Sequence, residues 1–227
     1  MAISTDSKQR LLDAAEKLFA ENGFEATSLR QITNAAGANL AAVNYHFGSK
    51  DGLIAAVFQR LVRPVNAERL RMLDEAQANG RRPTLEAIVR AFVTPPFRFR
   101  HLHGETERAL RLYGRTHAAS DSSIHAIFVQ QFDSVRRRFG ESLAQALPEL
   151  PETELHWRMH FLIGTMAQTM ADPERLRALS AGACDPDDID ATLSRLVPFL
   201  VAGMQAPLPP TARRRKSRNK PARRRKP

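Results

Sequence analysis

Polar and apolar residues alternate along the first sixty positions with the period of short amphipathic helices. Within Lys8–Ala20 the apolar positions, among them Leu11, Ala15 and Phe19, recur every three or four residues and so share one helical face. Asn22-Gly23 follows, and glycine readily takes the left-handed conformation that ends many helices. The pattern therefore predicts a first helix over Lys8–Ala20.

Two shorter helices are predicted directly afterwards. A second helix starts at Thr27-Ser28, where Ser28-x-x-Gln31 has the form of a capping box, and it stops at Gly37. Asn39 is a good N-cap for a third, very short helix over Leu40–Tyr45. Two helices joined by a tight glycine turn are typical of a helix-turn-helix motif.

The third helix has the side chains expected of a helix that enters a DNA groove. Ala41 and Ala42 are small enough for close approach in a major groove about 12 Å wide, and they can touch thymine methyl groups. Asn44 can hydrogen-bond to a base edge or to a phosphate. These residues make DNA the first partner to consider.

The rest of the pattern predicts a helical body interrupted by prolines. Ser49 caps a fourth helix that runs to Pro64, and Thr94-Pro-Pro96 is expected to break the chain because neither proline continues a helix well. The remaining predicted helices cover residues 66–79 and 84–93, Gly104–Ala118, Asp121–Leu147, Glu152–Ala171, a short helix opened by Asp172-Pro173, and a last helix opened by Asp185-Pro186 that ends near Met204. The sequence therefore predicts an all-α fold.

The net charge of the chain comes from its last twenty-one residues. Residues 207–227 hold ten of the 34 Lys and Arg residues and no acid, which leaves 24 basic and 24 acidic residues in the rest of the chain. The segment is also rich in proline and cannot form a core, so we expect a disordered basic tail. Such a tail attracts polyanions, above all nucleic acid.

Composition and motifs narrow the class of protein further. No apolar run approaches the roughly 18 residues that a membrane-spanning helix needs. The single cysteine, Cys184, fits a reducing cytoplasm. There is no nucleophile elbow and no phosphate-binding glycine loop after a strand. We expect a cytoplasmic, nucleoid-associated protein that uses no cofactor and is not an enzyme.

Two stretches near the N-terminus resemble a known family. Both are similar to parts of the DNA-binding domain of the TetR family of bacterial repressors. The first stretch is Thr27-Ser-Leu-Arg-Gln-Ile-Thr-Asn-Ala-Ala-Gly37, and the second is Asn44-Tyr-His-Phe-Gly-Ser-Lys-Asp-Gly-Leu53. The usual Gly-Val-Ser before the recognition helix is Gly37-Ala-Asn39 here, and asparagine caps a helix as well as serine. The resemblance implies an all-α homodimer.

The resemblance also implies domains and DNA contacts. A three-helix DNA-binding domain is expected over residues 1–50, and a ligand-binding and dimerisation domain over residues 51–206. By position, the expected base-facing residues are Leu40, Ala41, Ala42 and Asn44, and the expected phosphate contacts are Thr27, Tyr45, His46 and Lys50. For Lys50 the physics agrees, because free N–H groups at a helix start already favour an anion.

Phenylalanines gather in the middle of the body, where they form either a core or the wall of an apolar cavity. The segments Asn39–Asp74, Leu110–Thr116 and Leu155–Thr165 resemble the branch of the TetR family that senses fatty acids or acyl-CoA. This resemblance implies a cavity for an acyl chain, with Arg98 or Arg111 meeting the head group. The expected pocket residues are Phe92, Phe97, Arg98, Arg111, Phe128, Phe132 and Met166.

His156 and His160 have a spacing that can bind zinc on one helix. Trp157 stands where a metalloprotease has glutamate, and no third ligand is close in sequence, so no metal site is expected.

Two functions remain to be compared. The first is a homodimeric repressor that places its short third helices in successive major grooves of a near-palindromic operator and is released by a small hydrophobic effector. The alternative is an architectural DNA-binding protein without sequence preference, in which the basic tail dominates binding.

Overall fold

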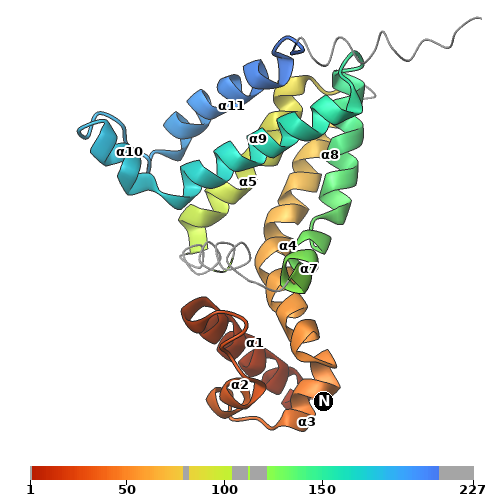
Figure 1. Ribbon diagram of the computed structural model, residues 1–227, viewed down its shortest axis with the longest axis vertical. Coiled ribbons are helices and arrows are strands. Elements are labelled where there is room, and N and C mark those ends of the chain that lie inside the picture. Colours follow the sequence, from red (N-terminus) through yellow and green to blue (C-terminus); the bar gives the residue numbers. More distant parts are fainter. Residues whose placement is uncertain (1, 79–81, 104–111, 113–121, 210–227) are drawn as a thin grey trace, which may run out of the picture.

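Every regular element in the described part of the chain is an α-helix, which confirms the predicted all-α fold. The computed structural model describes residues 2–78, 82–103, 112 and 122–209. The helices form a small N-terminal head and a larger body, and one long helix joins the two (Figure 1). Within those residues, no helix has the combination of length and apolar character that crossing a membrane requires.

The head consists of α1 (Ala2–Asn22), α2 (Leu29–Ala35), α3 (Leu40–Phe47) and the first turns of α4 (Lys50–Gln77). Helix α1 begins six residues before the predicted start at Lys8, whereas α2 and α3 begin where their predicted caps place them. The apolar faces of these helices meet in one core around Leu11, Phe19, Phe24, Ile32, Val43, Leu53 and Phe58.

Helix α4 passes through Pro64 without a break, so the predicted end at this proline is wrong. The predicted helix over residues 66–79 is the second half of α4. A proline inside a helix costs roughly 3 kcal/mol. Burial on both sides outweighs that cost, because Val57 and Phe58 lie in the core of the head and Leu73 lies in the core of the body.

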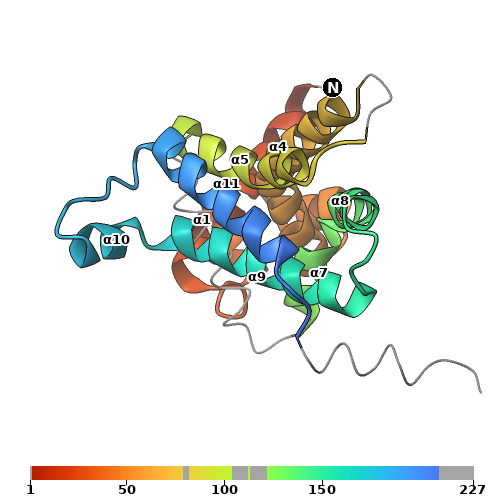
Figure 2. The same ribbon diagram turned by 90° about the horizontal axis from the view of Figure 1, so that it is seen from above.

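The body packs α4 against α5 (Leu85–His103), α8 (Asp133–Ala146), α9 (Glu152–Ala171) and α11 (Ile189–Gln205). Viewed from above, α9 and α11 run side by side, α5 and α4 lie on the other side of α11, and α8 lies to the right (Figure 2). Its hydrophobic core includes the buried residues Ile88, Phe92, Phe139, Leu143, Leu162, Val197 and Leu200.

Two further boundaries differ from the prediction. Helix α5 continues through Pro95 and Pro96, whose surroundings are buried, so no break occurs there. The predicted single helix over Asp121–Leu147 is two helices, α7 (Ser122–Gln130) and α8, with a turn at residues 131–132. The predicted helix over Gly104–Ala118 lies outside the described residues, apart from residue 112.

The starts of the last two helices illustrate how caps are chosen. Asp172 caps α10 (Pro173–Leu179), as predicted, by accepting a hydrogen bond from a backbone N–H at 3.0 Å. The predicted start of α11 at Asp185-Pro186 is wrong, because Asp188 caps this helix instead. Helix α11 then ends at Gln205, one residue beyond the predicted end.

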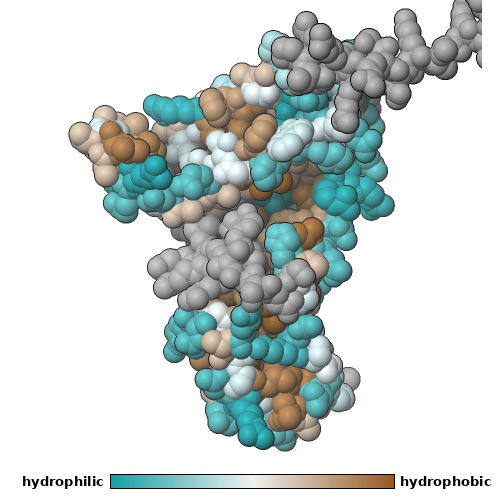
Figure 3. Space-filling model, in the orientation of Figure 1, coloured by the Kyte–Doolittle hydropathy of each residue, from teal (hydrophilic) through white to brown (hydrophobic). Residues whose placement is uncertain are grey.

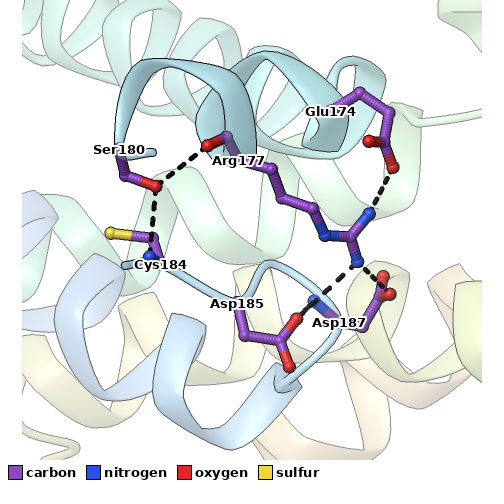
Figure 4. Close-up of polar contacts among 6 residues, drawn as sticks. All are labelled: Glu174, Arg177, Ser180, Cys184, Asp185 and Asp187. Atoms are coloured by element: carbon purple, nitrogen blue, oxygen red, sulfur yellow. Dashed lines mark hydrogen bonds and ion pairs between the residues drawn. The ribbon is translucent and has the colours of Figure 1, made fainter. Parts of the chain in front are cut away.

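Asp185 lies beside an ion-pair cluster, and its carboxylate accepts the N–H of Asp187 at 3.0 Å. Arg177 binds Glu174 and Asp187, and its guanidinium also lies 3.7 Å from the carboxylate of Asp185 (Figure 4). The Ser180 hydroxyl closes the turn by accepting the Cys184 N–H at 3.1 Å. These contacts hold α10 as a small arm that projects from the body (Figure 1).

One ion pair ties α1 to α4 and generates a stability prediction. Arg60 of α4 pairs with Glu16, whose side chain is almost fully buried, and with Asp13 at 2.5 Å. These carboxylates raise the pKa of Arg60 although desolvation acts against them. Arg60→Met should lower the free energy of unfolding by about 1–3 kcal/mol, because it removes the guanidinium that pairs with the buried Glu16 carboxylate. Arg63→Met, at an exposed position of the same helix, is the matched control in urea unfolding and should have little effect.

Candidate nucleic-acid interface

Helix α3 presents an unusual surface at the end of the head. Val43 is fully buried and anchors the helix, while Leu40 is 47% exposed and Tyr45 is 80% exposed. Ala41 and Asn44 are exposed beside them. A contiguous surface of apolar and amide side chains on a small helix is typical of a binding surface, and it fits direct contact with base edges in a major groove.

The turn before α3 makes this presentation possible. Gly37 has a φ of +57°, a conformation that residues with a side chain rarely adopt. The Asn39 side chain then accepts a hydrogen bond from the N–H of Ala42 at 2.9 Å. Gly48, with a φ of +75°, ends α3 and redirects the chain into α4. Both ends of α3 are therefore set by local chemistry.

Three predicted phosphate contacts lie around the end of α3 and the start of α4. Tyr45 points its ring into solvent, and His46 is half-buried with its Nε2 atom 3.0 Å from the Ser7 hydroxyl. Lys50 is the first residue of α4, directly after its cap, Ser49. The free N–H groups and the lysine together form a site that favours an anion.

The predicted phosphate contact by the Thr27 side chain is contradicted, because Thr27 is fully buried. Its hydroxyl donates to the carbonyl oxygens of Gly23 at 2.7 Å and Leu18 at 3.2 Å, so it stabilises the end of α1. The next residue, Ser28, is exposed and forms the predicted capping box with Gln31. Ser28, exposed at the N-terminus of α2, is better placed than Thr27 to meet a phosphate, and its sequence signature as a cap could have pointed to it.

The charge of the head is arranged in favour of this interface. On α1, three acids are bound by Arg10 and Arg60, which neutralises that helix. Between residues 26 and 50 the chain carries two cations, Arg30 and Lys50, and no acid. The helix-turn-helix segment is therefore weakly positive although the first fifty residues are neutral as a whole.

The structure does not bring the predicted pocket residues together around one cavity. Phe92, Phe97 and Met166 are buried in the core of the body. Phe128 instead packs on Phe58, next to the head, with ring centroids 5.2 Å apart. Phe132 contacts Phe128, at the turn between α7 and α8.

Of the two arginines predicted to meet a head group, only Arg98 lies within the described residues. Arg98 is exposed and lines a cleft of about 360 Å³ between α5 and α11. Arg111 lies outside the described residues. Helix α5 therefore supplies a cation at a cleft, as expected for a ligand site, but the predicted phenylalanines do not line this cleft.

A buried arginine in the body escaped the sequence analysis. Arg69 of α4 is 4% exposed, and no described carboxylate pairs with it. Its Nε donates to the Phe92 carbonyl at 2.9 Å. In a regular helix this carbonyl would accept the N–H of residue 96, but residue 96 is a proline and has no N–H. Asn66, one turn earlier, donates to the Gln131 carbonyl at 2.9 Å at the turn between α7 and α8. Burial lowers the pKa of Arg69 to about 10, so the side chain stays charged near neutral pH.

A second exposed apolar surface lies on the body. Trp157 and Phe161 of α9 are 57% and 60% exposed, and Phe199 of α11 is 67% exposed. The rings of Trp157 and Phe161 stack with centroids 5.8 Å apart. Figure 3 shows hydrophobic residues gathered over α9 and α11 on this side of the body. His156 and His160 are exposed beside them, and no metal-binding group of three His, Cys, Asp or Glu residues occurs within the described residues.

A helix-turn-helix head carried by a helical body defines the class of a DNA-binding regulator. Residues 11–57 match the family model for bacterial regulatory proteins of the tetR family. Residues 90–203 match the model for the C-terminal domain of tetracyclin repressor-like proteins. The chain therefore belongs to the TetR family, as its sequence resemblance indicates.

Several similar proteins are transcriptional repressors. The chain is 30% identical over 95 residues to the transcriptional repressor AcnR of Corynebacterium glutamicum, covering 42% of this chain and 45% of that protein. It is 44% identical over 70 residues to the nicotine-responsive repressor HdnoR of Paenarthrobacter nicotinovorans, covering 29% of this chain and 36% of that protein. The match thus spans less than half the length of these curated relatives.

Solved structures share the fold over most of the chain. The regulator FadR from Bacillus subtilis, in complex with stearoyl-CoA, has a TM-score of 0.58 at 15% identity and covers 86% of this chain and 98% of its own. The fatty acid degradation regulator FadR from Bacillus halodurans has the same TM-score and identity, with 88% and 97% coverage. At such identities the similarity establishes the fold.

The cap of α3 generates a prediction for the stability of the head. Asn39→Ala removes the side chain that accepts the Ala42 N–H and should lower the free energy of unfolding by about 1 kcal/mol. Asn39→Ser restores a capping oxygen and should unfold close to the wild-type protein. Thermal unfolding of the full chain measures both, and equal losses in the two variants would show that the cap does not hold α3.

Proposed function

We propose that this TetR-family protein is a homodimeric transcriptional repressor that binds a near-palindromic operator and is released by a small hydrophobic effector. The observation that carries the proposal is the capped and exposed α3, with its apolar and amide surface. The repressor relatives support the direction of regulation. The expected location is the cytoplasm, in association with the nucleoid.

In this proposal α3 enters the major groove. Leu40, Ala41, Ala42 and Asn44 face base edges, where the apolar side chains meet thymine methyl groups and the amide pairs with adenine or another base edge. The phosphate contacts come from Tyr45, His46 and Lys50, and Ser28 replaces Thr27 among them. Phosphate contacts fix the position of the head on the duplex, and base contacts select the sequence.

The exposed aromatic residues of α9 and α11 form the proposed dimer interface. A two-fold interface uses the same surface on both subunits. Phe161 and Phe199, which are exposed in one subunit, would therefore be buried in both subunits of the dimer. The two heads then read half-sites about 34–36 Å apart, or a multiple of this spacing.

The proposed effector is a fatty acid or an acyl-CoA. The FadR structures, one of them with stearoyl-CoA, support this class by their common fold. Of the expected pocket residues, Arg98 lies at the cleft between α5 and α11, where it can meet the head group of such an effector. An effector that prefers one arrangement of the heads lowers operator affinity by its difference in binding energy.

The basic tail favours a second function, an architectural DNA-binding protein without sequence preference. Ten cations in residues 207–227 attract the phosphate backbone of any DNA. Salt titration on operator and random DNA separates the two functions, because only a repressor keeps a preference for its operator.

Two substitutions in the head separate base reading from phosphate binding. Asn44→Ala should weaken operator binding by about 1–3 kcal/mol and leave binding to random DNA unchanged. Lys50→Ala should weaken binding to all DNA and reduce the slope of log affinity against log salt by about 1 per subunit.

Lys17→Ala, an exposed change on α1, is the control for charge alone. Fluorescence anisotropy at several salt concentrations measures all three variants. The proposed interface is wrong if Lys17→Ala changes the salt slope as much as Lys50→Ala does.

One substitution on α9 tests the dimer interface. Phe161→Glu should raise the dimer dissociation constant by about 100-fold or more, because each subunit would bury a carboxylate in an apolar interface. Val129→Glu places the same charge at an exposed apolar position of α7 and should leave the dimer intact. Sedimentation equilibrium gives both constants, and a fully dimeric Phe161→Glu protein would rule out this surface.

A further inference from the structure

A cleft between α5 and α11 holds a buried hydroxyl that has no hydrogen-bond partner among the described residues. Three of the residues that line the cleft are buried or half-buried. Met72 of α4 and Leu193 of α11 are apolar, and Thr94 of α5 carries the hydroxyl. Exposed side chains stand at its rim, and these are Arg90, Arg98, Asp190 and Ser194. The cleft has a volume of about 360 Å³, within the range of small-molecule sites.

The hydroxyl of Thr94 distinguishes this cleft from an ordinary surface depression. Thr94 is buried, and no described residue donates to or accepts from its Oγ1 atom. Ser142, the other buried hydroxyl of the body, donates to the Arg138 carbonyl and accepts from the Gln77 side chain. A buried polar atom without a partner costs free energy, so this hydroxyl on the wall of the cleft is available to hydrogen-bond to a ligand.

The neighbours of Thr94 on α5 are cationic. Arg90, Thr94 and Arg98 are spaced by four residues and therefore share one face of the helix, with a guanidinium one turn to each side of the hydroxyl. Arg90 forms an exposed ion pair with Glu86, 2.8 Å away, which a ligand can replace at little cost. Asp190 lies across the cleft on α11, so an anion is favoured on the α5 side.

We propose that this cleft binds the oxyanion of the acyl effector, with its apolar part against Met72 and Leu193. Arg90 and Arg98 pair with the charge, and the Thr94 hydroxyl donates to one oxygen. The oxyanion is either the carboxylate of a free fatty acid or a phosphate of an acyl-CoA. The inference rests on the proposed function as a ligand-responsive repressor and assigns its ligand site.

The position of the cleft provides a way to reach the DNA-binding head. Its walls belong to α4, which carries the head, and to α11, which forms part of the proposed dimer interface. A ligand in this cleft therefore contacts α4 and α11, the two helices that set the distance between the heads in the proposed dimer.

Thr94→Val is the most specific test, because it removes the hydroxyl with little change of shape. The melting temperature of the ligand-free protein should rise, since a buried unsatisfied hydroxyl is removed. Binding of the matching acid should weaken by about tenfold or more, the loss of one hydrogen bond to a charged group. A purely structural threonine predicts the first change without the second. Arg98→Gln should weaken the same binding.

Thr169→Val is the matched control, because the Thr169 hydroxyl already donates to the Thr165 carbonyl at 2.8 Å. The full-length dimer is titrated calorimetrically with straight-chain acids from hexanoate to octadecanoate, with the matching alcohols, with the CoA thioesters and with CoA alone. Melting and operator binding of each variant confirm that it is folded.

The proposal predicts that the wild-type protein prefers an acid over its alcohol, or a thioester over the acid, and that Thr94→Val and Arg98→Gln abolish this preference. A thioester preference identifies phosphate as the anion, and an acid preference identifies carboxylate. If the variants keep the preference, the cleft is not the site, although release of the operator by the same ligand would still support the proposed function. If no probe binds the wild-type protein, both the cleft and the acyl effector class are wrong, and operator binding remains a separate test of the repressor.

Discussion

The continuity of α4 is the constraint on which the rest of the structure depends. This helix contributes to both cores, with Phe58 buried in the head and Leu73 buried in the body, and it crosses Pro64 between them. Arg69 and Asn66 fix its position by bonding to carbonyl oxygens of two neighbouring elements, Phe92 of α5 and Gln131 after α7. Burial of an arginine without a carboxylate partner loses hydration free energy, and these hydrogen bonds offset part of that loss. Because α4 spans both cores and Phe128 of α7 also packs on Phe58 in the head, a change in the packing of the body can reach the head through these two helices.

Local chemistry builds the DNA-binding surface on this support. Gly37, Asn39 and Gly48 define where α3 begins and ends, and Val43 anchors it in the core of the head. The exposed surface of α3 is then free to carry residues chosen for contact rather than for packing. The body offers two different surfaces of its own, an aromatic one over α9 and α11 and a cleft with cations between α5 and α11. The surfaces proposed for DNA binding, dimerisation and ligand binding are thus separate, and the packing of α4, α5 and α11 connects them.

The sequence predicted the head almost completely, because caps and glycine turns are local signals. Ser28, Asn39, Ser49 and Asp172 all cap the helices that they were expected to cap. The errors arose where burial outweighed a local preference. Pro64, Pro95 and Pro96 lie inside helices, since the flanking residues are held in the cores. Asp188 caps α11 in place of Asp185. The Thr27 side chain is buried, and its hydroxyl donates to the Gly23 carbonyl at the end of α1. A pocket made of phenylalanines could not be predicted from helical spacing, because the same spacing also builds a core.

Selection of bound DNA from a random pool by the full-length protein tests the central claim most directly, that paired α3 helices read a specific operator. The account predicts enrichment of a near-palindromic site, with half-sites whose centres lie about one helical turn of DNA, or a multiple of it, apart. Recovery of DNA without a common sequence, at every salt concentration that permits binding, would contradict it and favour nonspecific binding through the basic tail.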